Sequence, residues 1–292
     1  MNIARLTLAA IVALMFASAV FAQDSTEAHL VIPDSRILPG VPFDFWIEVH
    51  NRGSQLKRVT VCAPFEMRIL SGEPLRFTEG APKQRSNQLY WPHGGEVIVG
   101  PGESKTLVIP ASDAQYGEFL DDRLFSAPGR RVGIRLPLCQ QIVGRYGQNG
   151  DRSTVQTNEV EIEIVNPSGS DATVWNLMEE TLNHRWTPAE FWRGERRAMW
   201  ESVLRDSPDS NYVPYALITT GRFSSDWRDL LAQQLRAIER FPESPAVEWL
   251  HVEAWLSARA IRAHGVMLAE GAIVRHSKRP TTRLLAFGNE QQ

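Results

Sequence analysis

The sequence predicts a chain of two structural classes, an all-β half followed by an all-α half. Apolar residues alternate with a period of two up to about residue 166, which is typical of half-buried strands. After the stretch 166–171, rich in Pro, Gly and Ser, the apolar period changes to about 3.6, which is typical of helices. The chain has 292 residues, of which 43% are apolar and 22% charged, a composition typical of folded globular proteins.

The first 22 residues have the pattern of a secretory signal peptide. Arg5 provides a positive start, an apolar run follows to Val20, and Val20-Phe21-Ala22 places small residues before a cleavage site. The apolar run is shorter than the roughly 20 residues that a membrane-spanning helix needs. We therefore expect cleavage near Ala22, a mature chain without a transmembrane segment, and an extracytoplasmic location, periplasmic or secreted.

Short alternating segments separated by Pro and Gly fill residues 27–166. The clearest is 159–165, where Val160, Ile162 and Ile164 share one face and three glutamates share the other. Seven to nine such strands without a helical pattern between them predict an antiparallel β-sandwich. The expected strands are 30–33, 43–50, 58–62, 65–70, 88–91, 96–99, 104–110, 131–136 and 159–165.

The chain has two cysteines, Cys62 and Cys139, and both lie in the β half. In an oxidising compartment they are expected to pair, and a bridge closing so long a loop stabilises by roughly 4 kcal/mol in the chain-entropy model. Two separate buried thiols are the alternative, because sequence does not show whether the two Cα atoms approach closely enough.

The β half resembles the immunoglobulin-like domains of bacterial exported proteins. The resemblance is carried by the run Leu38-Pro39-Gly40-Val41-Pro42 before the strand at 43–50, by the turn Val99-Gly100-Pro101-Gly102-Glu103, and by the closing strand from Gln156. It implies a sandwich of two sheets and is one of pattern rather than of a specific motif.

In the second half the apolar spacing predicts a series of helices. Thr187-Pro188-Ala189-Glu190 forms a complete capping box, with Pro188 suited to the first helical position. Ser244 and Pro245 are expected to open a later helix in the same way. The expected helices are 172–183, 187–205, 211–221, 225–241, 244–264 and 266–276.

A short stretch of the helical half occurs twice. Ser207 to Tyr215 recurs as Phe241 to Trp249, and Pro208 and Pro242 lie 34 residues apart, which is the period of a helix-turn-helix repeat. The matching pairs are Pro208 with Pro242, Asp209 with Glu243, Ser210 with Ser244, Val213 with Val247, and Tyr215 with Trp249.

At these residues the chain resembles a tetratricopeptide-like repeat. Ala237 and Pro242 match the small residue and the terminal Pro of the family's second helix, whereas Ile218 and Leu230 stand where the family prefers small residues. The resemblance covers about residues 200–264 and has no third copy, so it implies a degenerate repeat pair. The family's binding of peptides on the concave side is what this resemblance implies for function.

Seven of the nine tryptophans lie in the helical half. Most are expected in the core, since Trp buries a large apolar area. Tyr212, Tyr215, Trp249 and Trp255 fall on the first helices of the two repeats, which line the concave side in tetratricopeptide-like arrays. These four residues are therefore our candidate peptide-binding residues, with a core position as the alternative.

No segment of the sequence carries a recognisable catalytic, cofactor or metal motif. His251-Val252-Glu253 lacks the cysteine pair of zinc deaminases, and none of the seven histidines lies at ligand spacing from another on one helix. The net charge of −3 without a basic face argues against nucleic acid as a partner. A C-terminal basic cluster, expected on a solvated tail or against an acidic partner or lipid headgroups, comprises Arg275, His276, Lys278, Arg279 and Arg283.

These patterns predict a non-enzymatic exported interaction or scaffold protein of the bacterial cell envelope, which binds a protein or peptide through its helical domain. The alternatives are an extracytoplasmic hydrolase with a site assembled from distant residues, and a purely structural pair of domains. We expect no cofactor, no metal and no catalytic residue. The expected division is a signal peptide at 1–22, a β-sandwich at 23–166, a linker at 167–171, a tetratricopeptide-like domain at 172–288 and a tail at 289–292.

Overall fold

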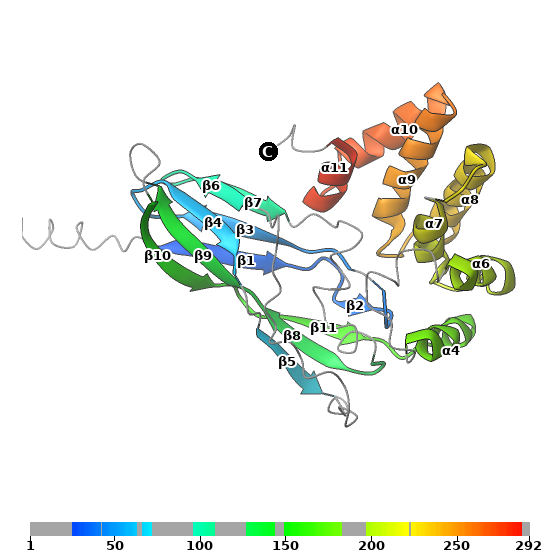
Figure 1. The fold of residues 1–292 in the computed structure, drawn as a ribbon, viewed down its shortest axis with the longest axis horizontal. Helices are drawn as coiled ribbons and strands as arrows, with labels where there is room; N and C mark the ends of the chain where they lie inside the picture. The colour runs from blue at the N-terminus through cyan, green and yellow to red at the C-terminus, as the bar shows by residue number, and fades with distance from the viewer. Residues whose placement is uncertain are drawn as a thin grey trace, which may run out of the picture.

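The structure is a computed structural model, and it describes residues 25–41, 43–62, 66–71, 96–108, 127–143, 149–182, 197–221 and 223–287. A part made of strands is followed by a part made of helices (Figure 1). The expected signal peptide, the expected strand at 88–91 and the capping box at 187–190 lie outside the described residues. The change of class falls between Ile164, where the last strand ends, and Ser170, where the first described helix begins.

The described strands form three sheets, with the orders β1-β3-β7, β10-β9-β4-β6 and β2-β11-β8-β5. All pairs are antiparallel except β2 with β11, which is parallel. The strands are β1 (Thr26–Val31), β2 (Arg36–Ile37), β3 (Trp46–Asn51), β4 (Lys57–Val61), β5 (Glu66–Ser71), β6 (Glu96–Val99), β7 (Ser104–Val108), β8 (Arg131–Arg135), β9 (Pro137–Val143), β10 (Asn149–Gln156) and β11 (Val160–Ile164).

The apolar faces of all three sheets contribute to one core. In β11 the expected alternation is present, because Ile162 and Ile164 are buried while Glu161 and Glu163 point outward. These glutamates pair across the strands with Arg131 and Arg36. The core also takes Ile47 from β3, Val59 from β4, Leu107 from β7 and Val132 from β8. The apolar alternation in the sequence thus identified the buried face of the sheets.

Cys62 and Cys139 form a disulfide, as the sequence predicted. Cys139 lies in β9, and Cys62 follows the end of β4, the strand paired with β9. Their Cα atoms are 5.4 Å apart, a normal distance for a bridge. The bridge closes a separation of 77 residues but joins two neighbouring strands of one sheet.

Three strands, β2, β9 and β10, were not predicted. β10 is an edge strand with the sequence NGDRSTVQ, and β9 beside it carries Gln140 and Gln141. Edge strands are partly solvated, so their polar residues hide the alternation on which sequence prediction depends. The parallel pair also departs from the expected antiparallel arrangement. Both β2 and β11 lead the chain toward the helical part, so they run in the same direction (Figure 1).

The helical part packs its helices one after another along the chain (Figure 1). None of the described helices combines the length and the apolar character needed to cross a membrane. One of them, α11, was not predicted, because the last expected helix ended at residue 276. Pro280 begins α11, since Pro suits the first helical position. The helices are α4 (Ser170–Leu182), α6 (Arg197–Asp206), α7 (Val213–Gly221), α8 (Trp227–Arg240), α9 (Val247–Ala260), α10 (His264–Arg275) and α11 (Pro280–Phe287).

The sequence repeat is also a repeat of backbone hydrogen bonds. The amide of Ser210 donates to the carbonyl of Ser207, and the amide of Ser244, 34 residues later, donates to that of Phe241, both at 3.0 Å. Val213 and Val247, which begin α7 and α9, then donate to the carbonyls of Ser210 and Ser244. Helix α9 therefore begins after Ala246, two residues later than Ser244 and Pro245 predicted.

The two parts of the chain share an apolar boundary. The segment after β2 enters the helical part, where Val41 is buried in the core of the helices and Leu38 packs against it. The hydroxyl of Tyr212 donates to the carbonyl of Pro39 at 3.0 Å. The helical core therefore includes residues of the first half, across the predicted domain boundary.

Candidate functional site

The structure places most of the candidate aromatic residues inside the protein. Tyr212, Tyr215 and Trp249 are buried in the core of the helices, with Tyr212 fully inaccessible to solvent. Burial raises the pKa of both tyrosines, and Asp171 raises that of Tyr212 further, so both stay neutral. These three residues fill the core because they face the neighbouring helices and the Pro39 segment, so the core position that the sequence left open applies to them.

Trp255 is half-buried and lies among the last three helices. Its ring centroid is 5.5 Å from that of Phe287 in α11, and the guanidinium of Arg259 lies 5.8 Å from its centre. A Cβ atom at Gly271 would lie 3.1 Å from the indole nitrogen of Trp255, so glycine permits this close approach of α10. Trp255 therefore joins α9, α10 and α11 and does not lie with the other three aromatic residues.

The C-terminal basic cluster divides into two groups. Arg279 points inward, where its guanidinium lies 2.9 Å from the Asp34 carboxylate. Arg283 donates to the carbonyl of Ser277. Arg275, His276 and Lys278 are exposed. The predicted solvated cluster is therefore smaller than the sequence suggested, because the turn before α11 directs Arg279 toward the β part.

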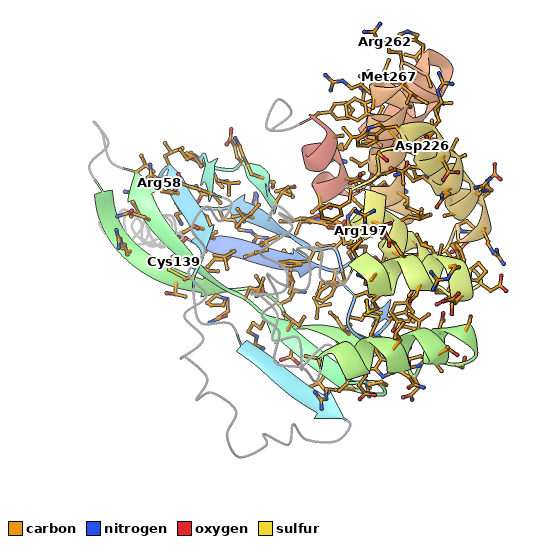
Figure 2. The ribbon with its side chains drawn as sticks, turned by 45° about the vertical axis from the view of Figure 1, so that its right-hand side comes forward. Arg58, Cys139, Arg197, Asp226, Arg262 and Met267 are labelled. Carbon is orange, nitrogen blue, oxygen red and sulfur yellow. A yellow bond between two sulfur atoms is a disulfide. The ribbon has the colours of Figure 1, made fainter. Side chains whose placement is uncertain are left out.

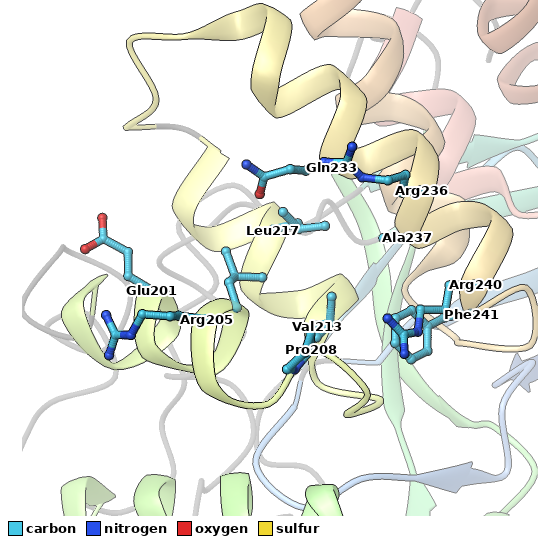
Figure 3. Close-up of a pocket in the computed structure, with 11 residues that line it drawn as sticks. Glu201, Arg205, Pro208, Val213, Leu217, Gln233, Arg236, Ala237, Arg240 and Phe241 are labelled. Atoms are coloured by element: carbon cyan, nitrogen blue, oxygen red, sulfur yellow. The ribbon is translucent and has the colours of Figure 1, made fainter.

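The described surface of the helical part contains a groove of about 530 Å³ between α6, α7 and α8. Its floor is apolar and is formed by Leu204, Val213, Leu217, Ala237 and Phe241. Polar side chains surround this floor: Glu201 and Arg205 from α6 on one side, and Gln233, Arg236 and Arg240 from α8 on the other (Figure 3). An apolar floor with a charged rim can bind a segment that has both apolar and charged side chains.

Local sequence explains how α8 forms one wall of the groove. Asp226 caps the helix by accepting hydrogen bonds from the amides of Arg228 and Asp229, at 3.0 and 3.1 Å. The helix buries Leu230 and Ala237 against its neighbours, which leaves Arg236 on the solvent side. The small side chain of Ala237 leaves room for the groove beside the larger floor residues.

The other wall depends on the turn between α6 and α7. Asp171, in the first turn of α4, accepts hydrogen bonds from the hydroxyl of Ser210 and from the amide and side chain of Asn211, all at 2.7 to 2.8 Å. These bonds fix the turn that carries Pro208 into the groove. The first repeat motif therefore borders the groove with its proline, while its aromatic residues lie in the core.

The arginines of the rim differ in their ionic partners. Both carboxylate oxygens of Asp206 accept hydrogen bonds from Arg205 at 2.8 Å, which raises the pKa of Arg205 and lowers that of Asp206. Arg240 pairs with Asp209 and stacks 5.7 Å from the ring centre of Phe241. Arg236 makes no ion pair with the part of the chain that the structure describes. The rim therefore presents one cation whose charge is not compensated locally.

Sequence analysis missed the groove residues, although two of them carried a usable signal. Arg236 and Arg240 lie four residues apart on the solvent side of α8, next to the small buried residue Ala237. The contribution of α6 and α7 to the floor, through Leu204 and Val213, depends on how these helices pack.

The hydrolase alternative requires carboxylates facing each other across an accessible cleft. Asp34 and Asp44 approach the same guanidinium, with Arg279 Nη1 2.9 Å from Asp34 and 3.8 Å from Asp44. Thr281 donates a hydrogen bond to Asp44, whose side chain is completely buried. Burial raises the pKa of Asp44 to about 6. This cluster joins the β and helical parts and offers a substrate no access to Asp44.

A histidine–glutamate pair is also largely buried between helices. Nδ1 of His251 lies 2.6 Å from the Glu270 carboxylate, and both side chains are largely buried between α9 and α10. Within the described ranges, no group of three or more His, Cys, Asp or Glu side chains is placed to hold a metal ion.

The similarity of this chain to known proteins is of limited extent. No family model and no curated protein matches the chain. Among solved structures, the ASH / PapD-like domain of human CEP192 (PapD-like domain 7) is similar to part of it, with 9% sequence identity and a TM-score of 0.24. The similarity covers 48% of this chain and 87% of that domain. We therefore infer the function from the geometry of the chain itself.

Proposed function

We propose that this protein is a non-enzymatic interaction module of the cell envelope and that it binds an extended peptide segment in the groove between α6, α7 and α8. The supporting observation is the apolar floor of this groove beside the uncompensated charge of Arg236. The chemistry of the groove favours a segment with an apolar side chain on Leu217 and Ala237 and a neighbouring Asp or Glu toward Arg236.

The groove also agrees with the family resemblances on which the sequence analysis relied. Helices α7 to α10 form two successive hairpins. The turns that precede α7 and α9 have the same pattern of backbone hydrogen bonds, as expected of a degenerate tetratricopeptide-like pair. The β part, with sheets around one core, is consistent with an immunoglobulin-like sandwich. An exported protein with a disulfide suits the oxidising envelope or the exterior of the cell.

A structural role is the second candidate, and the packed boundary between the parts favours it. Val41 and the Tyr212–Pro39 hydrogen bond connect the β part to the helical core, and Arg279 adds an ion pair with Asp34. Such a boundary holds the two parts at a fixed angle. A fixed angle is compatible with binding, since it presents the groove in one orientation.

The experiment is a selection of random peptides displayed on phage, using the purified mature chain as bait. We expect enrichment of sequences in which Asp or Glu stands beside Leu, Ile or Phe. Arg236→Glu should weaken binding of a selected synthetic peptide by about tenfold, corresponding to about 1.4 kcal/mol. Arg228→Glu is the matched control, because Arg228 is exposed on the same helix but does not line the groove.

Two results would overturn the binding proposal. One is a selection that yields no enriched acidic and apolar pattern. The other is equal binding by the Arg236→Glu and Arg228→Glu proteins. Either result, with both variants folded by circular dichroism, leaves the structural role as the better interpretation.

A further inference from the structure

The outer face of α10 is exposed, uncharged and largely apolar. Gly265, Leu268, Ala269, Ala272 and Ile273 recur at intervals of three and four residues, so they lie on one side of the helix, and all five are exposed. Leu268 is 70% exposed and Ile273 is 45% exposed. The opposite side of the helix buries Glu270, Gly271 and Val274. Helix α10 therefore packs one side within the protein and exposes a largely apolar side to solvent.

Positive charges lie at both ends of this face. Arg262 is exposed in the turn before α10, and Arg275 and Lys278 are exposed at its end. Figure 2 shows Arg262 at the tip of the helical part, where α9 turns into α10. The only carboxylate in the helix, Glu270, points inward to His251. A partner on this face would thus meet two positive ends and no negative charge from α10 itself.

The sizes of the exposed residues favour a helix as the occupant. Gly265, Ala269 and Ala272 allow another backbone to come close, while Leu268 and Ile273 project as knobs between the side chains of a facing helix. A Cβ atom at Gly265 would meet nothing within 4 Å, so the surface there is open. A membrane surface would favour bulky apolar side chains along the whole face, and here only two of the five are large.

The charges identify the kind of helix. A second copy of this chain would bring Arg262 and Arg275 against the same basic residues in either orientation, and like charges at such a contact oppose association. We propose that the outer face of α10 is the docking site for an amphipathic helix of a protein partner, whose apolar stripe is bordered by Asp and Glu. This face shares no residue with the groove of α6 to α8. The inference is therefore independent of the proposed peptide-binding function.

Two fluorescein-labelled synthetic helices provide the test. One has Leu and Ala on one side and Glu at its borders, and the other has Lys in place of Glu. Fluorescence anisotropy with the full mature chain should show binding of the Glu helix, weakening as salt is added. Leu268→Glu should weaken this binding at least about tenfold, because it places a like charge in the apolar contact.

Matched variants separate the surface from general effects. Ile98→Glu makes the same type of change at an exposed apolar residue of β6, and it should leave binding unchanged. Arg275→Glu should weaken the Glu helix and strengthen the Lys helix, which a merely unfolded protein would not do. Binding of a groove-selected peptide should be the same in the Leu268→Glu protein, so failure of this inference is distinguishable from failure of the groove proposal.

Several outcomes would overturn the inference. Equal binding of the Glu and Lys helices, or no binding of either, removes the acidic helix as occupant. Sedimentation with phosphatidylglycerol vesicles that Leu268→Glu abolishes would assign the face to a membrane instead. A dimer in sedimentation velocity that the same substitution dissociates would assign it to a second copy of the chain.

Discussion

Arginine–aspartate pairs occur in two regions of this molecule that differ in their exposure to solvent. At the groove rim, Arg205 and Asp206 are exposed and hydrogen-bonded at 2.8 Å. At the boundary between the β and helical parts, Arg279 approaches Asp34 and the completely buried Asp44. We call the boundary set of Asp34, Asp44, Arg279 and Thr281 the joint.

The comparison shows that solvent, rather than distance, decides what such a pair contributes. Water screens the rim pair, so its contribution to the free energy of unfolding is small and its charges stay available to a ligand. In the joint, burial penalises the ionised form of Asp44 more than Thr281 and Arg279 favour it, and its pKa rises to about 6. The joint therefore affects stability and its pH dependence, and the rim affects binding.

The largest expected effect is that of Arg279→Met. The substitution leaves Asp34 and the buried Asp44 without their cation, and breaking a buried pair in this way costs about 3–5 kcal/mol. Urea denaturation should show this loss in the free energy of unfolding. Arg205→Met at the rim is the control, for which we expect no measurable change in stability. Similar stability losses in the two variants would contradict the distinction between joint and rim.

A smaller effect, of opposite sign, is expected for Asp44→Asn. The folded pKa of Asp44, about 6, lies above its ordinary value of 3.8, so its ionisation opposes folding. The stability that protonation of Asp44 gives the folded protein is complete below about pH 3.8 and is lost as the pH rises through 6. Asparagine keeps an oxygen for the Thr281 hydroxyl but cannot ionise. The variant should therefore be more stable than the original protein at pH 7.5, by up to roughly 3 kcal/mol.

The pH profile of the difference is the measurement. Urea denaturation of both proteins from pH 5 to 7.5 should show the advantage of Asp44→Asn growing up to about pH 6, where Asp44 is ionised mainly in the unfolded chain, and levelling off above it, where folded Asp44 ionises as well. The neighbouring charges of Asp34, Glu248 and Arg279 are the same in both proteins and so cancel in this comparison. A variant that is less stable at pH 7.5, or a difference that does not vary with pH, would be inconsistent with the burial of this charge.

The smallest expected effect is that of Arg205→Gln on peptide binding. Arg205 is already paired with Asp206, so its loss should weaken binding of a selected acidic peptide only about two- to fivefold. Isothermal titration calorimetry at low and high salt should show this effect decreasing with salt. A loss greater than that of Arg236→Glu would mean that Arg205, and not Arg236, holds the ligand's charge.

Prediction from sequence was most successful where a local pattern determines the result. Alternation identified β11 and the buried face of β3, and the change of period located the helices. It was least successful for β10, a polar edge strand, and for β9, an inner strand in which Gln140 and Gln141 interrupt the apolar alternation. The aromatic residues show the same limit. A helical pattern predicts which side of the helix carries Tyr215 or Trp249, but it does not predict which segments pack against that side.

By itself the sequence determined the two classes of structure, the repeat of 34 residues and the cysteine pair available for a bridge. The first two depend on residues that are neighbours along the chain. The third depends on disulfide chemistry, for which the chain has two cysteines. The tertiary structure decided that Tyr212 and Trp249 are core, that Arg279 turns inward, and that Arg236 borders a groove. These outcomes depend on contacts between distant segments, and a side chain becomes core or surface only when its neighbours in space are present.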